Sequence, residues 1–251
     1  MGQEIVKKKI VGMMVVGPGE ADRWLEPVLE QRKELVDDMI IVGNNTDPKT
    51  EKLIKKFGYW YYRDDREWGI YQPDIKTELL ARVAKLKPNW VLPSDADEVY
   101  DKYFTRGEVE KLMEVNYAGY YFAIVNLWDD PDHYRHDLSF WNIRMFRLMP
   151  QYGLNFGRKK LHCGLAPAFV YKYGANAPFI VKHYGLMKAE DRVKKVARYD
   201  KYDPKAVYKG REYYDKLKTN RFIVPFNEGS FHQKIAAEVA NQDQRTKIIN
   251  D

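Results

Sequence analysis

Cysteine is nearly absent from this sequence of 251 residues, which contains only Cys163. A single cysteine cannot form an intramolecular disulfide, and it excludes a zinc site built from several thiolates. Long apolar runs are also missing. None approaches the roughly 20 residues that a membrane-spanning helix needs, and the N-terminus lacks the apolar core of a signal peptide. We therefore expect a cytoplasmic protein without an integral membrane segment, for which a peripheral contact with a membrane stays open.

Positive charge is in modest excess but is not concentrated. The formal net charge is +6, yet only Lys7–Lys9 and Arg158–Lys160 form basic runs. Nucleic-acid-binding proteins usually gather their charge into a patch, so a nucleic-acid partner is not expected. The aromatic share of 14% suits a cleft that stacks on bases or sugars. A non-catalytic basic module, which would bind nucleic acid or membrane through the helices of residues 188–218, stays open as an alternative.

Strand and helix patterns alternate over the first part of the chain. Short apolar runs predict strands at 10–16, 39–42, 59–62 and 90–95, and helical spacing predicts helices at 20–36, 48–57 and 73–86. Asp47 before Pro48 is a typical helix start. This β-α-β-α-β-α-β order implies a parallel sheet with right-handed crossovers.

The pattern changes after this alternating part. It predicts a helix at 107–115, strands at 119–128, 139–148, 168–173 and 179–183, and helices at 189–199, 204–217 and around 235–241. The sequence therefore predicts the α/β class, with a mixed central sheet flanked by helices. We expect one domain at 1–218 and a helical C-terminal extension at 219–251, part of which is loosely ordered.

An abrupt change from apolar to acidic residues marks the middle of the chain. Trp90, Val91 and Leu92 precede Asp95-Ala96-Asp97-Glu98. Side chains alternate along an extended segment, so Asp95 and Asp97 point the same way. Two carboxylates on one face suit a hard divalent cation such as Mg²⁺ or Mn²⁺. A solvated strand end is the alternative, because acid-x-acid patterns also arise by chance.

The turn after the first strand limits the choice of fold. Dinucleotide-binding folds carry a Gly-x-Gly-x-x-Gly fingerprint at this turn. Here Gly17-Pro18-Gly19 is followed by Glu20-Ala21-Asp22, so the last glycine is missing. A sugar nucleotidyltransferase stays open as an alternative, although Glu20 stands where that chemistry favours a basic residue.

Taken in order, several segments resemble the family 2-like glycosyltransferases of the GT-A fold, over roughly residues 8–203. Ser94-Asp95-Ala96-Asp97-Glu98 resembles the metal motif of this family. Residues 10–17 are similar to its first strand, and residues 40–47 to its second-strand motif. The closing segments of a bacterial and phage branch are similar to Leu161-His162-Cys163-Gly164 and to Val181-Lys182-His183-Tyr184-Gly185, followed by Arg192, Lys195 and Arg198-Tyr199.

The resemblance implies a glycosyltransferase that uses a nucleotide sugar, a UDP- or GDP-sugar, and a carbohydrate or lipid-linked acceptor. It also implies Mn²⁺ or Mg²⁺, held by Asp97 and His183, with Asp95 on the metal or the ribose. Glu98 would orient one of these ligands without binding the metal itself; a surface acid is the alternative. The alternative for His183 is a structural histidine.

Other residues are expected around the donor by position. Pro18 and Glu20 would line the base pocket, and Asp65 would reach the base from the third strand. The second-strand motif departs from the family because Gly43-Asn44-Asn45 replaces its usual carboxylates. Asn45 could still offer an amide to a base edge, and Lys76 could meet a phosphate. For Asn45 a turn and for Lys76 a solvated helix position are the alternatives.

Inverting transfer also needs a carboxylate that deprotonates the acceptor hydroxyl. The stretch 128–137 is the densest acidic and aromatic cluster of the second half and follows an apolar strand. We predict Asp130 as this base, with Asp137 next. A solvated acidic loop is the alternative. His162 is a weaker candidate for an acceptor or phosphate contact.

Overall fold

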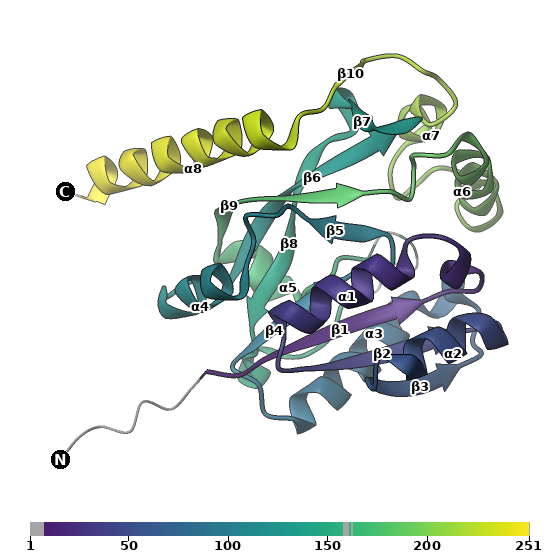
Figure 1. Cartoon of the computed structure of the whole chain (residues 1–251), viewed down its shortest axis with the longest axis horizontal. Coiled ribbons are helices and arrows are strands. Elements are labelled where there is room, and N and C mark those ends of the chain that lie inside the picture. Colours follow the sequence, from purple (N-terminus) through teal and green to yellow (C-terminus); the bar gives the residue numbers. More distant parts are fainter. Residues whose placement is uncertain (1–7, 158–160, 162, 251) are drawn as a thin grey trace.

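The computed structural model describes residues 8–157, 161 and 163–250, with side chains up to residue 242. Its parallel strands run in the order β4-β1-β2-β3 (Figure 1). These strands are β1 (Ile10–Val16), β2 (Asp38–Asn44), β3 (Trp60–Asp64) and β4 (Trp90–Ser94). The crossovers carry the short helix η1 (Glu20–Asp22), α1 (Leu25–Leu35), α2 (Pro48–Lys56) and α3 (Trp68–Lys85). The predicted cap of α2 is confirmed, because the Asp47 side chain accepts a hydrogen bond from the Thr50 backbone N–H at 3.0 Å.

The second half extends the same sheet with antiparallel and parallel strands. The strand β8 pairs antiparallel with both β4 and β6, and β9 pairs parallel with β6. The elements of this half are β5 (Glu98–Tyr100), α4 (Arg106–Glu114), β6 (Gly119–Trp128), β7 (Asp130–Arg135), η2 (His136–Leu138), β8 (Phe140–Arg147), η3 (Pro150–Tyr152), α5 (Ala168–Lys172), β9 (Gly174–His183), α6 (Ala189–Tyr202) and α7 (Arg211–Lys216). The predicted mixed α/β sheet flanked by helices is therefore confirmed.

The C-terminal segment packs onto this sheet. The strand β10 (Ile223–Pro225) pairs with β7, and the helix α8 (Glu228–Asn250) lies against β9 and projects beyond the body of the molecule (Figure 1). Phe226 and Ile235 belong to a buried apolar cluster with Leu127 and Ile180. None of the helices in the described part of the chain is long and apolar enough to cross a bilayer.

Burial on both faces explains why the central strands are almost wholly apolar. Trp90 and Leu92 join one apolar cluster, whereas Val91 between them joins the cluster on the other face. Burying each such side chain contributes about 1.5–3 kcal/mol. The strand β4 ends at Ser94, so the acids that follow emerge at the carboxyl edge of the sheet.

Two element predictions are wrong. Residues 168–173, a predicted strand, fold as the helix α5, because a short apolar run does not by itself distinguish the two structures. The helix predicted at 204–217 is reduced to α7. The Asp203 carboxylate accepts hydrogen bonds from the backbone N–H groups of Val207 (2.8 Å) and Tyr208 (3.1 Å), which stabilises a turn instead.

Other boundaries also differ from the predictions. The predicted helix 20–36 is split into η1 and α1, and α3 begins five residues earlier than predicted, at Trp68. Three further strands, β5, β7 and β10, occupy segments that the pattern left unassigned.

Candidate active site

A cavity of about 930 Å³ opens at the carboxyl ends of the central strands. In open α/β sheets this edge is where ligands bind. The residues that follow β1, β2 and β4 form one wall. Residues of α3, β6, β8, β9, α6 and α7 and of the segment before α5 are among those that line the other parts. The cavity brings together most of the predicted site residues: Pro18, Glu20, Asn45, Lys76, Asp95, Asp97 and His183.

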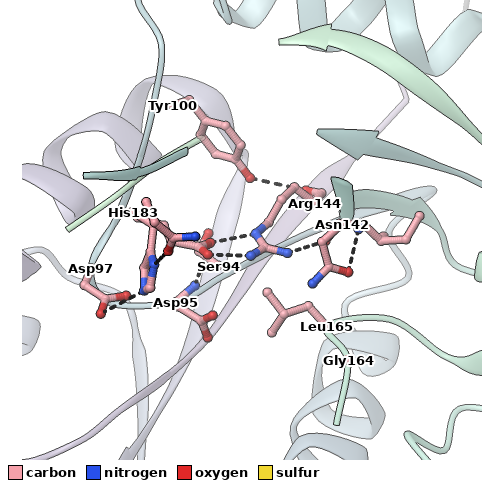
Figure 2. A network of polar contacts seen from close by, with 12 residues as sticks. Ser94, Asp95, Asp97, Tyr100, Asn142, Arg144, Gly164, Leu165 and His183 are labelled. Atoms are coloured by element: carbon pink, nitrogen blue, oxygen red, sulfur yellow. Dashed lines mark hydrogen bonds and ion pairs between the residues drawn. The ribbon is translucent and has the colours of Figure 1, made fainter. Parts of the chain in front are cut away.

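Asp97 and His183 face each other on the cavity wall. Asp97 Oδ2 lies 3.5 Å from His183 Nε2, and the antiparallel pairing of Glu98 with His183 between β5 and β9 brings the two segments together. Figure 2 shows the imidazole beside the Asp97 carboxylate, with Asp95 next to them. Burial opposes the negative charge of Asp97, but the attraction of His183 and then of Lys195 and Arg23 holds the pKa of Asp97 below its usual range.

The neighbour of His183 fixes which ring nitrogen carries the proton. Asn126 donates its amide N–H to the carbonyl of Leu138 at 2.5 Å, so the Asn126 amide oxygen accepts from His183 Nδ1. A neutral imidazole with its proton on Nδ1 presents a lone pair at Nε2. In this neutral form Nε2 and the Asp97 carboxylate are both acceptors, and a cation between them would stabilise the arrangement; in the protonated form Nε2 instead donates to the carboxylate, 3.5 Å away.

Gly185 makes this close approach possible. A Cβ atom at position 185 would lie 2.0 Å from Asp97 Oδ2 and 2.7 Å from His183 Nε2. Any larger residue there would displace the carboxylate or the imidazole.

We expect Gly185→Ala to retain the fold but to weaken Mn²⁺ binding by roughly 10–100-fold, the usual effect of disturbing the support of a metal ligand. Titration of Mn²⁺ followed by electron paramagnetic resonance would measure this. Gly107→Ala is the matched control, since its Cβ would have no neighbour nearer than 3.8 Å. Wild-type Mn²⁺ affinity in Gly185→Ala would contradict the assignment.

A buried ion pair lies next to the acidic segment that follows β4. Glu98 is 2% exposed, and its Oε2 accepts a hydrogen bond from Arg144 Nε at 2.6 Å. Arg32, fully buried, donates to Ser94 Oγ at 2.7 Å and to the Glu98 carbonyl at 2.8 Å. These contacts fix the backbone on both sides of Asp95, and Figure 2 shows Ser94, Asp95 and Arg144 in this part of the site. Burial, with the charge of Glu98, raises the pKa of Asp95, whose carboxylate accepts no hydrogen bond from a described residue.

Glu20 and Asp191 share one guanidinium at the cavity wall. Arg23 Nη1 lies 2.8 Å from Glu20 Oε1, and Arg23 Nη2 lies 2.9 Å from Asp191 Oδ2. Glu20 Oε2 is buried, and no described residue donates to it. Burial, reinforced by the charge of Asp97, raises the pKa of Glu20 to about 7 despite the nearby Arg23.

This pKa shift predicts a pH-dependent stability difference. Between about pH 4.5 and 7 the folded chain retains a proton on Glu20 that the unfolded chain releases, so stability falls as pH rises through this window. The ionised form costs roughly 2–4 kcal/mol above it. We expect metal-free Glu20→Gln to match wild type at pH 5 and to be more stable at pH 8. Urea unfolding in EDTA measures this, and a pH-independent difference would contradict it.

Of the other residues predicted to contact the donor, Lys76 and Asn45 line the cavity and Asp65 does not. Lys76 lines the cavity, but its ammonium donates to the carbonyls of Cys163 (3.3 Å) and Gly164 (3.2 Å). Asn45 is exposed and donates to the Arg66 carbonyl at 3.1 Å, which leaves its amide oxygen as an acceptor. Asp65 is exposed and does not line the cavity; its carboxylate pairs with Arg63 at 2.9 Å.

The structure does not bring the predicted catalytic acids to the cavity. The Asp130 carboxylate is about half exposed and lies 2.8 Å from His133 Nδ1, and Asp137 lies 2.8 Å from Arg135 Nε. Neither is among the described residues that line the cavity. Their role as base stays a prediction without support from this geometry. His162 lies outside the described residues.

The sequence did not predict some residues of the site. Asn126 could have been found, because it is a single amide near the end of the apolar strand β6. Arg23 and Asp191 gave no signal, because surface charges at helix starts are common. Arg144 falls on the predicted strand 139–148, where an arginine is usually exposed, although its side chain is only 3% exposed.

The comparisons with known proteins give structural likenesses only. No protein-family model matches the sequence, and no curated protein matches it. TarS of S. aureus is similar with a TM-score of 0.48 and 10% identity, over 84% of this chain and 42% of TarS. This chain therefore spans less than half the length of TarS.

Two further solved structures are similar. A protein of Desulfovibrio desulfuricans G20, provisionally described as a nucleotide-diphospho-sugar transferase, has a TM-score of 0.43 and 11% identity, over 84% of this chain and 95% of that one. Glucosyl-3-phosphoglycerate synthase of Mycobacterium tuberculosis, solved with Mn²⁺ and UDP, has a TM-score of 0.33 and 17% identity, over 48% of this chain and 44% of that one.

Proposed function

We propose that this protein is a metal-dependent glycosyltransferase, which moves a sugar from a UDP- or GDP-sugar to a hydroxyl group of a carbohydrate or lipid-linked acceptor. One observation carries the proposal. Asp97 Oδ2 and His183 Nε2 face each other at 3.5 Å, at the carboxyl edge of an α/β sheet and beside the carboxylate of Asp95, which accepts no hydrogen bond from a described residue.

Mn²⁺ or Mg²⁺ fits these residues. Carboxylates suit both ions, and imidazole is an acceptable partner of Mn²⁺. In an ideal octahedral shell with bonds of about 2.1 Å, neighbouring ligand atoms lie roughly 3 Å apart, close to the separation of Asp97 Oδ2 and His183 Nε2. Within the described residues no group of three His, Cys, Asp or Glu side chains could hold a metal alone. This agrees with an ion that takes further ligands from water and from the donor diphosphate.

The bound ion would neutralise charge that develops on the nucleoside diphosphate as the glycosidic bond breaks. The chain itself supplies the positioning. Asn126 holds the imidazole so that Nε2 faces Asp97, and Gly185 leaves room for both. The Glu98–Arg144 pair fixes the strand end that presents Asp95 and Asp97. Each group is held before the donor arrives, which lowers the cost of ordering the site.

The products distinguish this proposal from its main alternative. UDP-sugars and GDP-sugars should be hydrolysed slowly to the nucleoside diphosphate with Mn²⁺ present and not after EDTA treatment. Chromatography of the nucleotides measures this. A sugar nucleotidyltransferase would instead consume a nucleoside triphosphate and a sugar phosphate with release of pyrophosphate, or form both from the nucleotide sugar with uptake of pyrophosphate. That result would overturn the proposal.

A further inference from the structure

A stripe of basic side chains on α6 faces the cavity. Lys194, Lys195, Arg198 and Lys201 all line it. Arg198 lies four residues after Lys194 and three after Lys195, and Lys201 follows three residues later, which places these side chains on one side of the helix. The opposite face is anchored in the protein, where the buried Arg192 donates to the carbonyl of Met187 at 2.7 Å and to Asp129 at 2.8 Å. The fold therefore holds the basic stripe toward the cavity.

Most of this positive charge is not compensated. Lys201 pairs with Glu67 at 2.8 Å. Lys194, Lys195 and Arg198 form no hydrogen bond or ion pair with a described residue. Like charges at these spacings on a helix repel one another and weaken it. Several cations on one helix face that lines a cavity favour an anionic ligand there, whereas a paired helix charge such as Lys55, which contacts Glu51, is already compensated.

The three unpaired cations do not occupy equivalent places. Lys195 is half-buried, and its charge acts on Asp97, which assigns it to the donor side of the cavity. Lys194 and Arg198 lie one helical turn apart and are exposed. Their charge is available for an anion other than the donor diphosphate.

An exposed aromatic ring lines the same cavity. Phe140 lines the cavity and is 44% exposed, which is unusual for so apolar a side chain. An exposed ring suits stacking against the apolar face of a sugar. A ring and cations lining the same cavity fit a ligand that carries both a sugar and a phosphate.

We propose that Lys194 and Arg198 bind a phosphate group of the acceptor, so that the acceptor is a phosphorylated carbohydrate, whether free or linked to a lipid. The identity of this ligand as the acceptor rests on the proposed function. The binding of phosphate at the two side chains does not.

The test is a calorimetric titration of glucose 6-phosphate, with glucose as the uncharged probe, into protein that is saturated with UDP and Mn²⁺. We expect the phosphorylated sugar to bind at least ten times more tightly than glucose. Lys194→Gln/Arg198→Gln should weaken its binding by roughly 10–100-fold, because charge-assisted hydrogen bonds are lost. Lys188→Gln/Lys205→Gln removes the same charge from exposed positions outside the cavity lining and should bind like wild type.

Each outcome is decisive. Equal binding of glucose 6-phosphate by wild type and Lys194→Gln/Arg198→Gln, or no binding by either, would overturn the proposal. Displacement of glucose 6-phosphate by UDP and Mn²⁺ would also overturn it, and would assign the two cations to the donor. If UDP does not bind, the proposed function fails. The same titration without nucleotide then still decides whether Lys194 and Arg198 bind phosphate. The same titration with a phosphorylated polyprenol in detergent distinguishes the two kinds of acceptor. Tighter binding of the polyprenol than of glucose 6-phosphate indicates a lipid-linked acceptor, and weaker binding indicates a free one.

Discussion

Asp97→Asn should abolish metal-dependent hydrolysis of the donor, with a loss of about a thousandfold or more. The amide keeps the volume of the side chain but removes the charge that faces His183 Nε2 at 3.5 Å. Loss of a metal ligand forfeits several kcal/mol of transition-state stabilisation, and each 1.4 kcal/mol corresponds to about tenfold in rate. Release of UDP or GDP from the nucleotide sugar, at saturating Mn²⁺, gives the measurement.

Two comparisons make this result specific. Asp65→Asn removes an exposed carboxylate that lies outside the cavity lining, so its activity should equal that of wild type. The thermal unfolding of Asp97→Asn should show that the fold is intact. Hydrolysis by Asp97→Asn within a few fold of wild type would remove Asp97 from the site.

Arg144→Met should destabilise the protein by about 3–5 kcal/mol, the usual cost of leaving one partner of a buried ion pair without the other. Glu98 is 2% exposed, and its carboxylate receives hydrogen bonds from Arg144. Met fills a similar volume but cannot compensate the charge. Urea unfolding of the metal-free protein measures the loss.

The double variant Arg144→Met/Glu98→Gln separates charge from packing. Removal of the orphaned charge should recover most of the lost stability, because a neutral amide costs much less to bury than an ion. If Arg144→Met unfolds within 1 kcal/mol of wild type, then the pair does not support the strand end in the way we describe.

The sequence predicts the first half of the fold well, for physical reasons. The strands β1, β2 and β4 are short, apolar and buried on both faces, and local turn or cap residues such as Asp47 mark where the next helix begins. Asp95 and Asp97 are found because the chain changes from apolar to acidic residues at the edge of the sheet. Each of these sequence patterns is local, because its residues lie within a few positions of one another along the chain.

Long-range pairing could not be predicted in the same way. The strand β5 has only three residues, yet its pairing with β9 brings His183 to Asp97. The contact between Glu98 and Arg144 spans 46 residues. Nothing local in either segment specifies its partner. The prediction of His183 as a ligand therefore depended on the family resemblance, and its role on the metal stays a proposal.

The position of Asp130 shows what a local sequence argument leaves undetermined. It follows an apolar strand, as Asp95 does, but the chain reverses at Asp129, whose φ of 67° lies in the left-handed region. A β-bulge at the end of β6 accompanies this turn, and Asp130 begins β7, which pairs with β10 away from β4. The sequence does not distinguish a strand that ends at the cavity from one that turns into a hairpin.

A crystal structure with Mn²⁺ and UDP, with data collected at the manganese absorption edge, tests the metal site most directly. We predict one anomalous peak within about 2.5 Å of both Asp97 Oδ2 and His183 Nε2, with the diphosphate on the same ion. A peak remote from His183, or bound UDP with no manganese beside Asp97, would contradict it.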